Sequence, residues 1–195
     1  MAANYVLDGT KIAWHLDRVA AWERGERIPP ITMDVSLTTN CNASCEWCAA
    51  KYQTGKRASI PLDRVRILLE DAAEIGVRGM VFMSDGESTL HPAWAEALIY
   101  GKSIGLDMAA ASNGFLITPE LSERVLPHLT YLQINFSAGE PTRYAEIIGV
   151  PKFWYPRVRE NIRHMVAAKR RHGYEVTINM SMVCHPQDAD QILPF

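Results

Sequence analysis

The chain has 195 residues, which is long enough for one domain with a sizeable hydrophobic core. Its net charge of −2 and pI of about 6.3 give no reason to expect binding to nucleic acid or to an anionic membrane surface. No apolar run reaches the roughly 18 residues of a membrane helix, and the first residues do not resemble a signal peptide, so we expect a cytoplasmic protein with reduced thiols.

Residues 1–30 are predicted to form an N-terminal helical extension, whose helix is capped by Asp8 or Thr10 and ends at Gly25. From residue 31 to residue 195, predicted strands alternate with predicted helices, which is typical of an α/β fold with a parallel sheet. The expected strands cover residues 31–39, 79–83, 107–111, 131–136 and 175–184. The expected helices cover residues 61–76, 91–105, 118 onward, 141–148, 156–171 and 188–193. This pattern does not separate an open sheet from a barrel, but in both architectures ligands bind at the carboxyl ends of the strands.

Three of the four cysteines lie in one loop directly after the first predicted strand, in the run Cys41-Asn-Ala-Ser-Cys45-Glu-Trp-Cys48. Three thiolates on one short loop can hold three corners of a cubane iron–sulfur cluster and leave the fourth iron open to a second molecule. Structural zinc stays an alternative, although it usually takes four ligands from two separated pairs. An electron-carrying ferredoxin would need a fourth cysteine, and the remaining one, Cys184, lies in an apolar strand-like run where a core role is more typical. A disulfide framework would need more cysteines in a shorter, secreted chain.

The spacing Cys-x-x-x-Cys-x-x-Cys, with Trp47 before the last cysteine, resembles the cluster loop of the radical S-adenosylmethionine (radical SAM) enzymes. After the second predicted strand, Gly86-Glu87 resembles the family's Gly-Gly-Glu-Pro motif, although Asp85 replaces a glycine and Ser88 replaces the proline. Taken by itself, this run also fits an ordinary surface turn. Its distance from the cysteine loop favours the family motif.

Two further motifs follow the next two predicted strands. Ser112-Asn113-Gly114 resembles the family's Thr-Asn-Gly turn, although Asn-Gly is also a common turn by itself. The fourth strand ends near Ser137, where the family often has a serine that contacts the ribose or carboxylate of the cofactor. By the period of two along a strand, Gln133, Asn135 and Ser137 are expected on one polar face.

The resemblance implies a partial (βα) TIM-type barrel, of which about five βα units of an expected six are present, so that residues 31–195 are a radical SAM core domain truncated at its C-terminus. It also implies a 4Fe-4S cluster and S-adenosylmethionine as cofactors. Reductive cleavage of S-adenosylmethionine would give a 5′-deoxyadenosyl radical that takes hydrogen from a substrate. The implied site residues are Cys41, Cys45 and Cys48 as cluster ligands, Gly86 and Glu87 at the methionyl amino group, Asn113 and Ser137 at the ribose or carboxylate, and Trp47 near the cluster and adenine.

The substrate is the least defined part of this interpretation. A small metabolite or sugar is favoured, a peptide-modifying maturase is the alternative, and a non-catalytic zinc or iron–sulfur module remains a third hypothesis. The expected partners are a small-molecule substrate and a reductant such as flavodoxin or ferredoxin. Arg143 is a candidate for pairing with the methionyl carboxylate, and His185 for contacting the substrate, although both fit solvent-exposed positions equally well.

Overall fold

A computed structural model describes residues 10–83 and 85–195 of the chain. The chain divides into two compact units, with the boundary between Pro30 and Ile31. In the first unit a 3-10 helix, η1 (Thr10–His15), leads into α1 (Leu16–Glu23), where the sequence predicts one continuous helix. The alternative cap at Asp8 lies outside the described residues.

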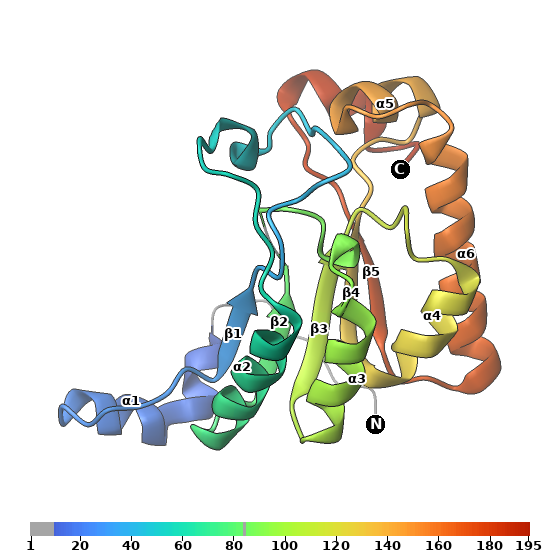
Figure 1. Cartoon of the computed structure of the whole chain (residues 1–195). Helices are drawn as coiled ribbons and strands as arrows, with labels where there is room; N and C mark the ends of the chain where they lie inside the picture. Colours follow the sequence, from blue (N-terminus) through green and yellow to red (C-terminus); the bar gives the residue numbers. More distant parts are fainter. Residues whose placement is uncertain (1–9, 84) are drawn as a thin grey trace. The chain divides into compact units, whose positions relative to one another are not determined.

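The second unit is built on one five-stranded parallel sheet (Figure 1). The strands lie side by side in chain order, β1-β2-β3-β4-β5. A doubly wound sheet reverses its strand order at a switch point, whereas a barrel winds in one direction, so this order is that of a partial barrel. The predicted α/β fold with parallel strands is therefore confirmed. The strands are β1 (Thr32–Val35), β2 (Gly79–Phe82), β3 (Asp107–Ser112), β4 (Leu129–Asn135) and β5 (Thr177–Ser181).

The outer helices α2, α3, α4 and α6 pack against one another in the order of the chain and cover one face of the sheet (Figure 1). This arrangement follows from crossovers of one hand between neighbouring parallel strands. The predicted helix over 188–193 is wrong, because the chain there forms the end of a 3-10 helix, η5. The helices of this unit are α2 (Leu62–Glu74), α3 (Trp94–Ser103), α4 (Pro119–Val125), α5 (Pro141–Ile148) and α6 (Trp154–His172), with the 3-10 helices η2 (Ala49–Tyr52), η3 (Ser88–Leu90), η4 (Leu126–His128) and η5 (Pro186–Gln191).

Local signals in the sequence account for several of these boundaries. The hydroxyl of Thr118 accepts a hydrogen bond from the backbone N–H of Leu121 at 3.3 Å, and Pro119 occupies the first turn of α4. Helices α5 and α6 both end on a glycine with φ of 68°, at Gly149 and Gly173. A left-handed conformation at this position is favourable for glycine because it has no Cβ.

The hydrophobic core lies between the sheet and the outer helices. Side chains on the outer face of the central strands are completely buried, and burying each contributes about 1.5–3 kcal/mol. The opposite, inner face is only half-buried, and on β4 it carries Gln133 and Asn135. The inner surface of the sheet is therefore polar and is not buried in the hydrophobic core. The fully buried residues of the outer face include Met80, Phe82, Met108, Leu132 and Ile134.

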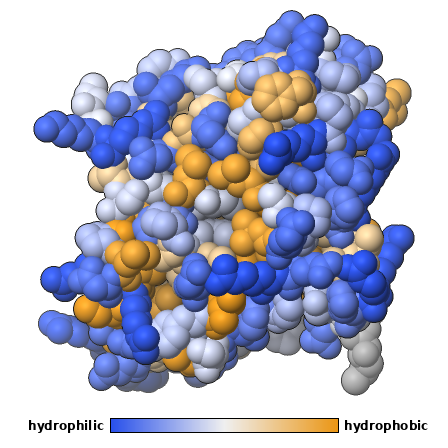
Figure 2. All heavy atoms as spheres, turned by 45° about the vertical axis from the view of Figure 1, so that its right-hand side comes forward, coloured by the Kyte–Doolittle hydropathy of each residue, from blue (hydrophilic) through white to orange (hydrophobic). Residues whose placement is uncertain are grey.

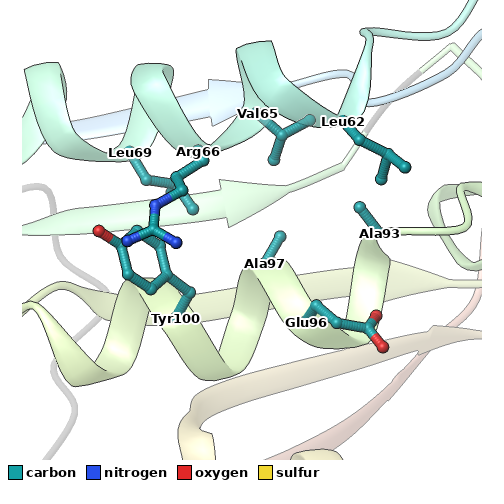
Figure 3. Close-up of a pocket in the computed structure, with 8 residues that line it drawn as sticks. All are labelled: Leu62, Val65, Arg66, Leu69, Ala93, Glu96, Ala97 and Tyr100. Carbon is teal, nitrogen blue, oxygen red and sulfur yellow. The ribbon is translucent and has the colours of Figure 1, made fainter.

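A hollow of about 230 Å³ lies between α2 and α3 on the outside of the sheet (Figure 3). The guanidinium of Arg66 lies over the ring of Tyr100 at 4.3 Å, and Glu70 accepts hydrogen bonds from both side chains. No cysteine lines this hollow. Hydrophilic side chains predominate on the face shown in Figure 2, and apolar ones form smaller groups between them. None of the helices described is long and apolar enough to cross a membrane.

Candidate active site

A cavity of about 200 Å³ lies at the carboxyl ends of the strands, where the fold predicts a ligand site. The cysteine loop forms one wall and the segment after β2 another, while the ends of β3 and β4 complete it. The cavity therefore brings together segments that are far apart in the sequence. Its lining consists of Cys41, Ala43, Cys45, Trp47, Cys48, Met83, Asp85, Gly86, Glu87, Ala111, Ser112, Asn113, Gln133, Asn135 and Ile148.

The cysteine loop is held by the C-terminal end of α5. The backbone N–H groups of Ser44 and Glu46, which flank Cys45, donate to the carbonyl oxygens of Ile148 and Ile147 at 3.0 and 2.8 Å. These carbonyls are free to accept because the last turn of a helix leaves its C=O groups without helical partners. The end of α5 thus serves as a support for the loop that carries the thiols.

Burial raises the pKa of the Cys41 thiol, and it raises the pKa of Cys45 to about 12, with the negative charges of Cys41 and Cys48 acting in the same direction. Thiolates at Cys41 and Cys45 are therefore favourable only beside a positively charged centre. A cubane cluster binds each thiolate at a different iron, and three thiols on one short loop can supply those ligands, whereas structural zinc usually takes four protein ligands.

Glu87 is 4% exposed, and its carboxylate connects the segment after β2 to the end of β3. Oε1 accepts hydrogen bonds from the hydroxyl of Ser112 at 2.8 Å and from the backbone N–H and hydroxyl of Thr89 at 3.1 and 2.6 Å. Oε2 accepts a hydrogen bond from the backbone N–H of Asn113 at 2.7 Å. Since a carboxylate oxygen has two lone pairs, Oε2 retains acceptor capacity at the edge of the cavity.

Gly86 allows a close backbone approach between the second and first strand ends. A Cβ at this position would lie 2.4 Å from the carbonyl oxygen of Asn40 and 2.5 Å from that of Thr38. The backbone N–H of Glu87 donates to the same Asn40 oxygen at 2.7 Å. The glycine therefore lets Glu87 lie directly beside the start of the cysteine loop.

Asn113 also binds the cysteine loop, since its side-chain amide donates to Oδ1 of Asn42 at 2.7 Å. The side chain of Ser137 lies beside that of Asn135, as the strand alternation predicts, although β4 itself ends at Asn135. Ser137 is completely buried, and it is not one of the described residues that line the cavity.

The hydroxyl of Ser137 orients Asn135 instead. It accepts a hydrogen bond from the backbone N–H of Val183 at 3.2 Å and donates its proton to Oδ1 of Asn135 at 2.8 Å. The oxygen of the Asn135 amide is thereby bound, and its NH₂ group is left for the cavity.

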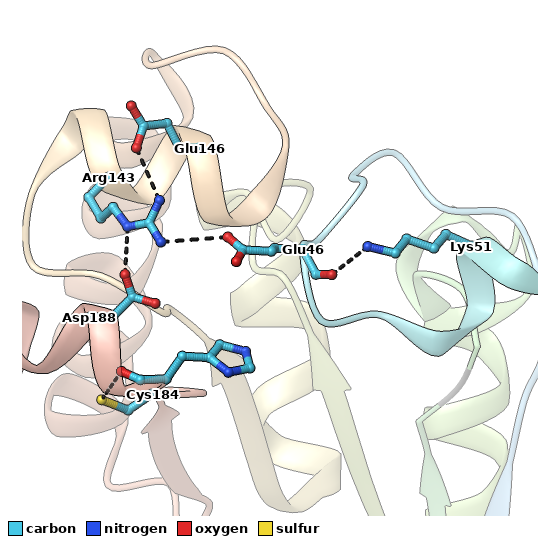
Figure 4. A network of polar contacts seen from close by, with 7 residues as sticks. Glu46, Lys51, Arg143, Glu146, Cys184 and Asp188 are labelled. Atoms are coloured by element: carbon cyan, nitrogen blue, oxygen red, sulfur yellow. Dashed lines mark hydrogen bonds and ion pairs between the residues drawn. The ribbon is translucent and has the colours of Figure 1, made fainter.

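The guanidinium of Arg143 on α5 is surrounded by three carboxylates (Figure 4). Its Nε donates to Asp188 at 2.6 Å, Nη1 donates to Glu146 at 3.1 Å, and Nη2 lies 3.5 Å from Glu46 in the cysteine loop. These contacts raise the pKa of Arg143, chiefly through the hydrogen bond to Asp188. The network connects α5 with the cysteine loop and with η5, so the arginine already has protein partners in place of the expected cofactor carboxylate.

A comparison with protein families adds to this geometry. The model of the Radical SAM superfamily matches residues 35–192, which is most of the chain. The chain belongs to the radical SAM superfamily. Members of this superfamily are enzymes that use S-adenosylmethionine and an iron–sulfur cluster.

Individual relatives of this radical SAM chain differ in the reactions for which they are named. It is 29% identical over 109 residues to the AdoMet-dependent heme synthase of Methanosarcina barkeri, covering 55% of this chain and 27% of the relative. It is 26% identical over 167 residues to the PqqA peptide cyclase of Gluconobacter oxydans, covering 84% of this chain and 44% of the relative. The chain thus spans less than half the length of either relative.

Solved structures show the same fold at low sequence identity. Streptococcus suis SuiB bound to the precursor peptide SuiA superposes with a TM-score of 0.72 at 15% identity, covering 97% of this chain and 42% of SuiB. BtrN in complex with AdoMet and 2-DOIA superposes with a TM-score of 0.58 at 14% identity, covering 79% and 58%. These similarities confirm the partial barrel expected from the motifs.

Most of the expected site residues of the radical SAM chain meet at one cavity, namely the three cysteines, Trp47, Gly86, Glu87 and Asn113. Sequence reasoning missed Ser112 as a partner of Glu87 and Asn42 as a partner of Asn113. Asn42 has no signal of its own in the sequence, and Ser112, although it opens the Ser112-Asn113-Gly114 motif, acts through a hydrogen bond to a distant segment that the motif does not predict. Asn135 does carry a signal, since it lies on the polar face of its strand.

Proposed function

We propose that this chain is the cofactor-binding part of a radical SAM enzyme, in which Cys41, Cys45 and Cys48 hold a 4Fe-4S cluster and the adjoining cavity receives S-adenosylmethionine. The observation that carries the proposal is that three thiols and the Glu87 carboxylate line one cavity at the carboxyl ends of the strands. When bound, the cluster supplies the electron that cleaves S-adenosylmethionine into methionine and a 5′-deoxyadenosyl radical. The protein itself binds and orients the reactants and excludes water.

The residues of the cavity have complementary roles in this proposal. The methionyl ammonium is placed at the remaining acceptor site of Glu87, with Gly86 beside it, because an ammonium group binds best to a carboxylate and nearby backbone carbonyls. Asn113 and the amide of Asn135, oriented by Ser137, supply neutral hydrogen-bonding groups for the ribose or carboxylate. Trp47 provides an apolar surface for the adenine and the cluster.

The residues of the cavity also bear on the substrate from which the radical would take hydrogen. A small metabolite or sugar suits the neutral polar inner face of β4, where Gln133 and Asn135 offer hydrogen bonds without charge. A peptide is the second candidate, favoured by the similarity to the PqqA peptide cyclase over 84% of this chain. We also propose the cytoplasm as the compartment, since the thiols must stay reduced to bind a cluster.

Anaerobic reconstitution with iron and sulfide tests the proposal. We expect iron and sulfide to bind with a visible absorbance band, and 5′-deoxyadenosine to form after dithionite and S-adenosylmethionine are added. Bound zinc without iron would instead support a structural module. A cluster that never yields 5′-deoxyadenosine would indicate an electron carrier.

Two cysteine variants make the test specific. Cys45→Ala should lose the cluster, whereas Cys184→Ala should keep it, because Cys184 is exposed and does not line the cavity. A normal cluster in the Cys45→Ala variant would contradict the ligand assignment.

A further inference from the structure

Three cations lie close together in the exposed loop that follows the last cysteine: Lys51, Lys56 and Arg57. In the part of the chain that the structure describes, no carboxylate lies within ion-pair distance of any of them. Lys51 and Arg57 do donate hydrogen bonds, but to the backbone carbonyl oxygens of Glu46 and Thr39. These acceptors are neutral, so no direct ion pair compensates the three positive charges within the described residues. The loop is therefore locally basic, although the net charge of the whole chain is −2.

The cations line two hollows beside the cysteine loop. A small hollow of about 50 Å³ is lined by all three cluster cysteines together with Lys51, Arg57 and Asp85, among others. An adjoining hollow of about 110 Å³ is lined by Lys51, Lys56 and Arg57 with neutral residues. Neither hollow is lined by Gln133 or Asn135 of the inner face, so this side is distinct from the part of the cavity that β4 lines.

The acidic groups near this surface do not cancel its charge. Asp85 is the one carboxylate among the residues that line the two hollows. The carboxylate of Glu46, which is next to Cys45, is directed to Arg143 on α5. Tyr52 adds an aromatic ring that is 76% exposed, with Nζ of Lys51 5.1 Å from its centroid. Aromatic residues such as tyrosine are enriched in protein–protein interfaces.

We propose that Lys51, Tyr52, Lys56 and Arg57, here called the basic surface, form the docking site for an acidic one-electron carrier protein. This inference rests on the proposed function, which requires an electron to reach a cluster held by Cys41, Cys45 and Cys48. One electron leaves the reduced carrier and enters the oxidised cluster, and no bond is made or broken. The basic surface suits this step because two of its residues, Lys51 and Arg57, line one hollow together with all three cysteines.

The physical chemistry of such encounters fits a small charged surface. Electron-transfer complexes are weak and bury little area, so their formation depends on electrostatic attraction more than on apolar contact. Opposite charges steer the partners together and raise the association rate 10–10³-fold, an effect that salt screens. An acidic carrier and a basic surface beside the cluster meet these conditions.

Lys56→Glu is the most direct test, because Lys56 is exposed and makes no hydrogen bond or ion pair within the described residues. The probe is a reduced acidic flavodoxin, and the bleaching of the reconstituted cluster is followed by stopped-flow absorbance. At low ionic strength we expect a several-fold slower reduction by flavodoxin, and roughly tenfold for Lys51→Glu/Lys56→Glu. Reduction by dithionite, a small reductant, should proceed at the unchanged rate, and the difference for flavodoxin should vanish at high salt.

Arg170→Glu is the matched control. It makes the same change in charge at an exposed position in the last turn of α6, which precedes β5 and so lies at the amino end of the sheet. Equal rates for Lys56→Glu and Arg170→Glu with flavodoxin would overturn the proposal, as would an equal slowing with both reductants. Titration of the oxidised protein with oxidised flavodoxin gives a second readout, in which Lys56→Glu alone should weaken binding. If the dithionite-reduced protein fails to cleave S-adenosylmethionine, the proposed function fails while docking is still measured by cluster reduction and binding.

Discussion

Replacing Gly149 by alanine should show how much the end of α5 stabilises the cysteine loop, beyond what a glycine contributes at the end of any helix. Gly149 ends α5 with φ of 68°, and a Cβ there would lie 2.4 Å from the carbonyl oxygen of Ser44. Gly173 ends α6 with the same φ, but a Cβ there would meet nothing within 4 Å. The two glycines therefore share the same backbone strain on substitution, and Gly149 alone carries the contact with the loop of the thiols.

The size of the effect follows from these contacts. In both variants the left-handed conformation costs alanine about 1 kcal/mol. In Gly149→Ala the Ser44 carbonyl must also move by about 0.6 Å to reach even a close non-bonded distance. That shift strains the two hydrogen bonds from the loop to Ile148 and Ile147, which contribute about 1 kcal/mol each. We therefore expect the free energy of unfolding to fall by about 3 kcal/mol in Gly149→Ala and by about 1 kcal/mol in Gly173→Ala.

Urea unfolding of the two apo variants measures these losses, and iron bound after reconstitution measures the effect on the site. Gly173→Ala should bind as much iron as the unmodified chain, whereas Gly149→Ala should bind clearly less because Cys45 is displaced. Equal losses of stability and equal iron content in the two variants would refute the idea that α5 supports the cysteine loop.

Three further predictions concern the polar contacts around the cavity. Glu87→Gln should lower the free energy of unfolding by about 1–3 kcal/mol in urea titrations, because an amide NH₂ would then face a backbone or hydroxyl donor. The same variant should bind S-adenosylmethionine more weakly. Unchanged stability would contradict the hydrogen bonds assigned to the Glu87 carboxylate. Arg143→Gln should lower the free energy of unfolding by about 3 kcal/mol, because Asp188, whose side chain is 1% exposed, would lose its counter-charge. The double variant Arg143→Gln/Asp188→Asn should recover part of this loss in urea titrations. If the effects of the two single variants simply add in the double variant, the two residues do not form a coupled pair. Ser137→Ala should weaken S-adenosylmethionine binding in calorimetry, yet add no further loss in an Asn135→Ala background; a further loss there would mean that Ser137 contacts the cofactor itself.

Much of the architecture could be predicted from local patterns. The alternation of strands and helices, including the helix expected from residue 118 onward, depends on residues within a few positions of one another. The spacing of Cys41, Cys45 and Cys48 also depends on one short segment, and it indicates the cluster chemistry without any knowledge of the fold. Backbone geometry and side-chain propensity act over this range, which is why the predicted alternation of strands and helices agrees with the structure.

The assembly of the site depends on contacts between segments that lie far apart in the chain. Ser112 reaches Glu87 across 25 positions, Arg143 reaches Asp188 across 45, and Asn113 reaches Asn42 across 71. Strand order, which identifies the partial barrel, is equally a property of the packed sheet.

Ser137 shows the difference most clearly. Strand periodicity places it beside Asn135, and the two side chains are indeed in contact, but its hydroxyl is buried against Val183 and does not line the cavity. The chemistry expected of the cysteine loop can thus be predicted from the eight residues 41–48 alone. The acceptors and amides that would hold its cofactor obtain their positions from tertiary packing, because hydrogen bonds select partners by distance in space and not by separation along the chain.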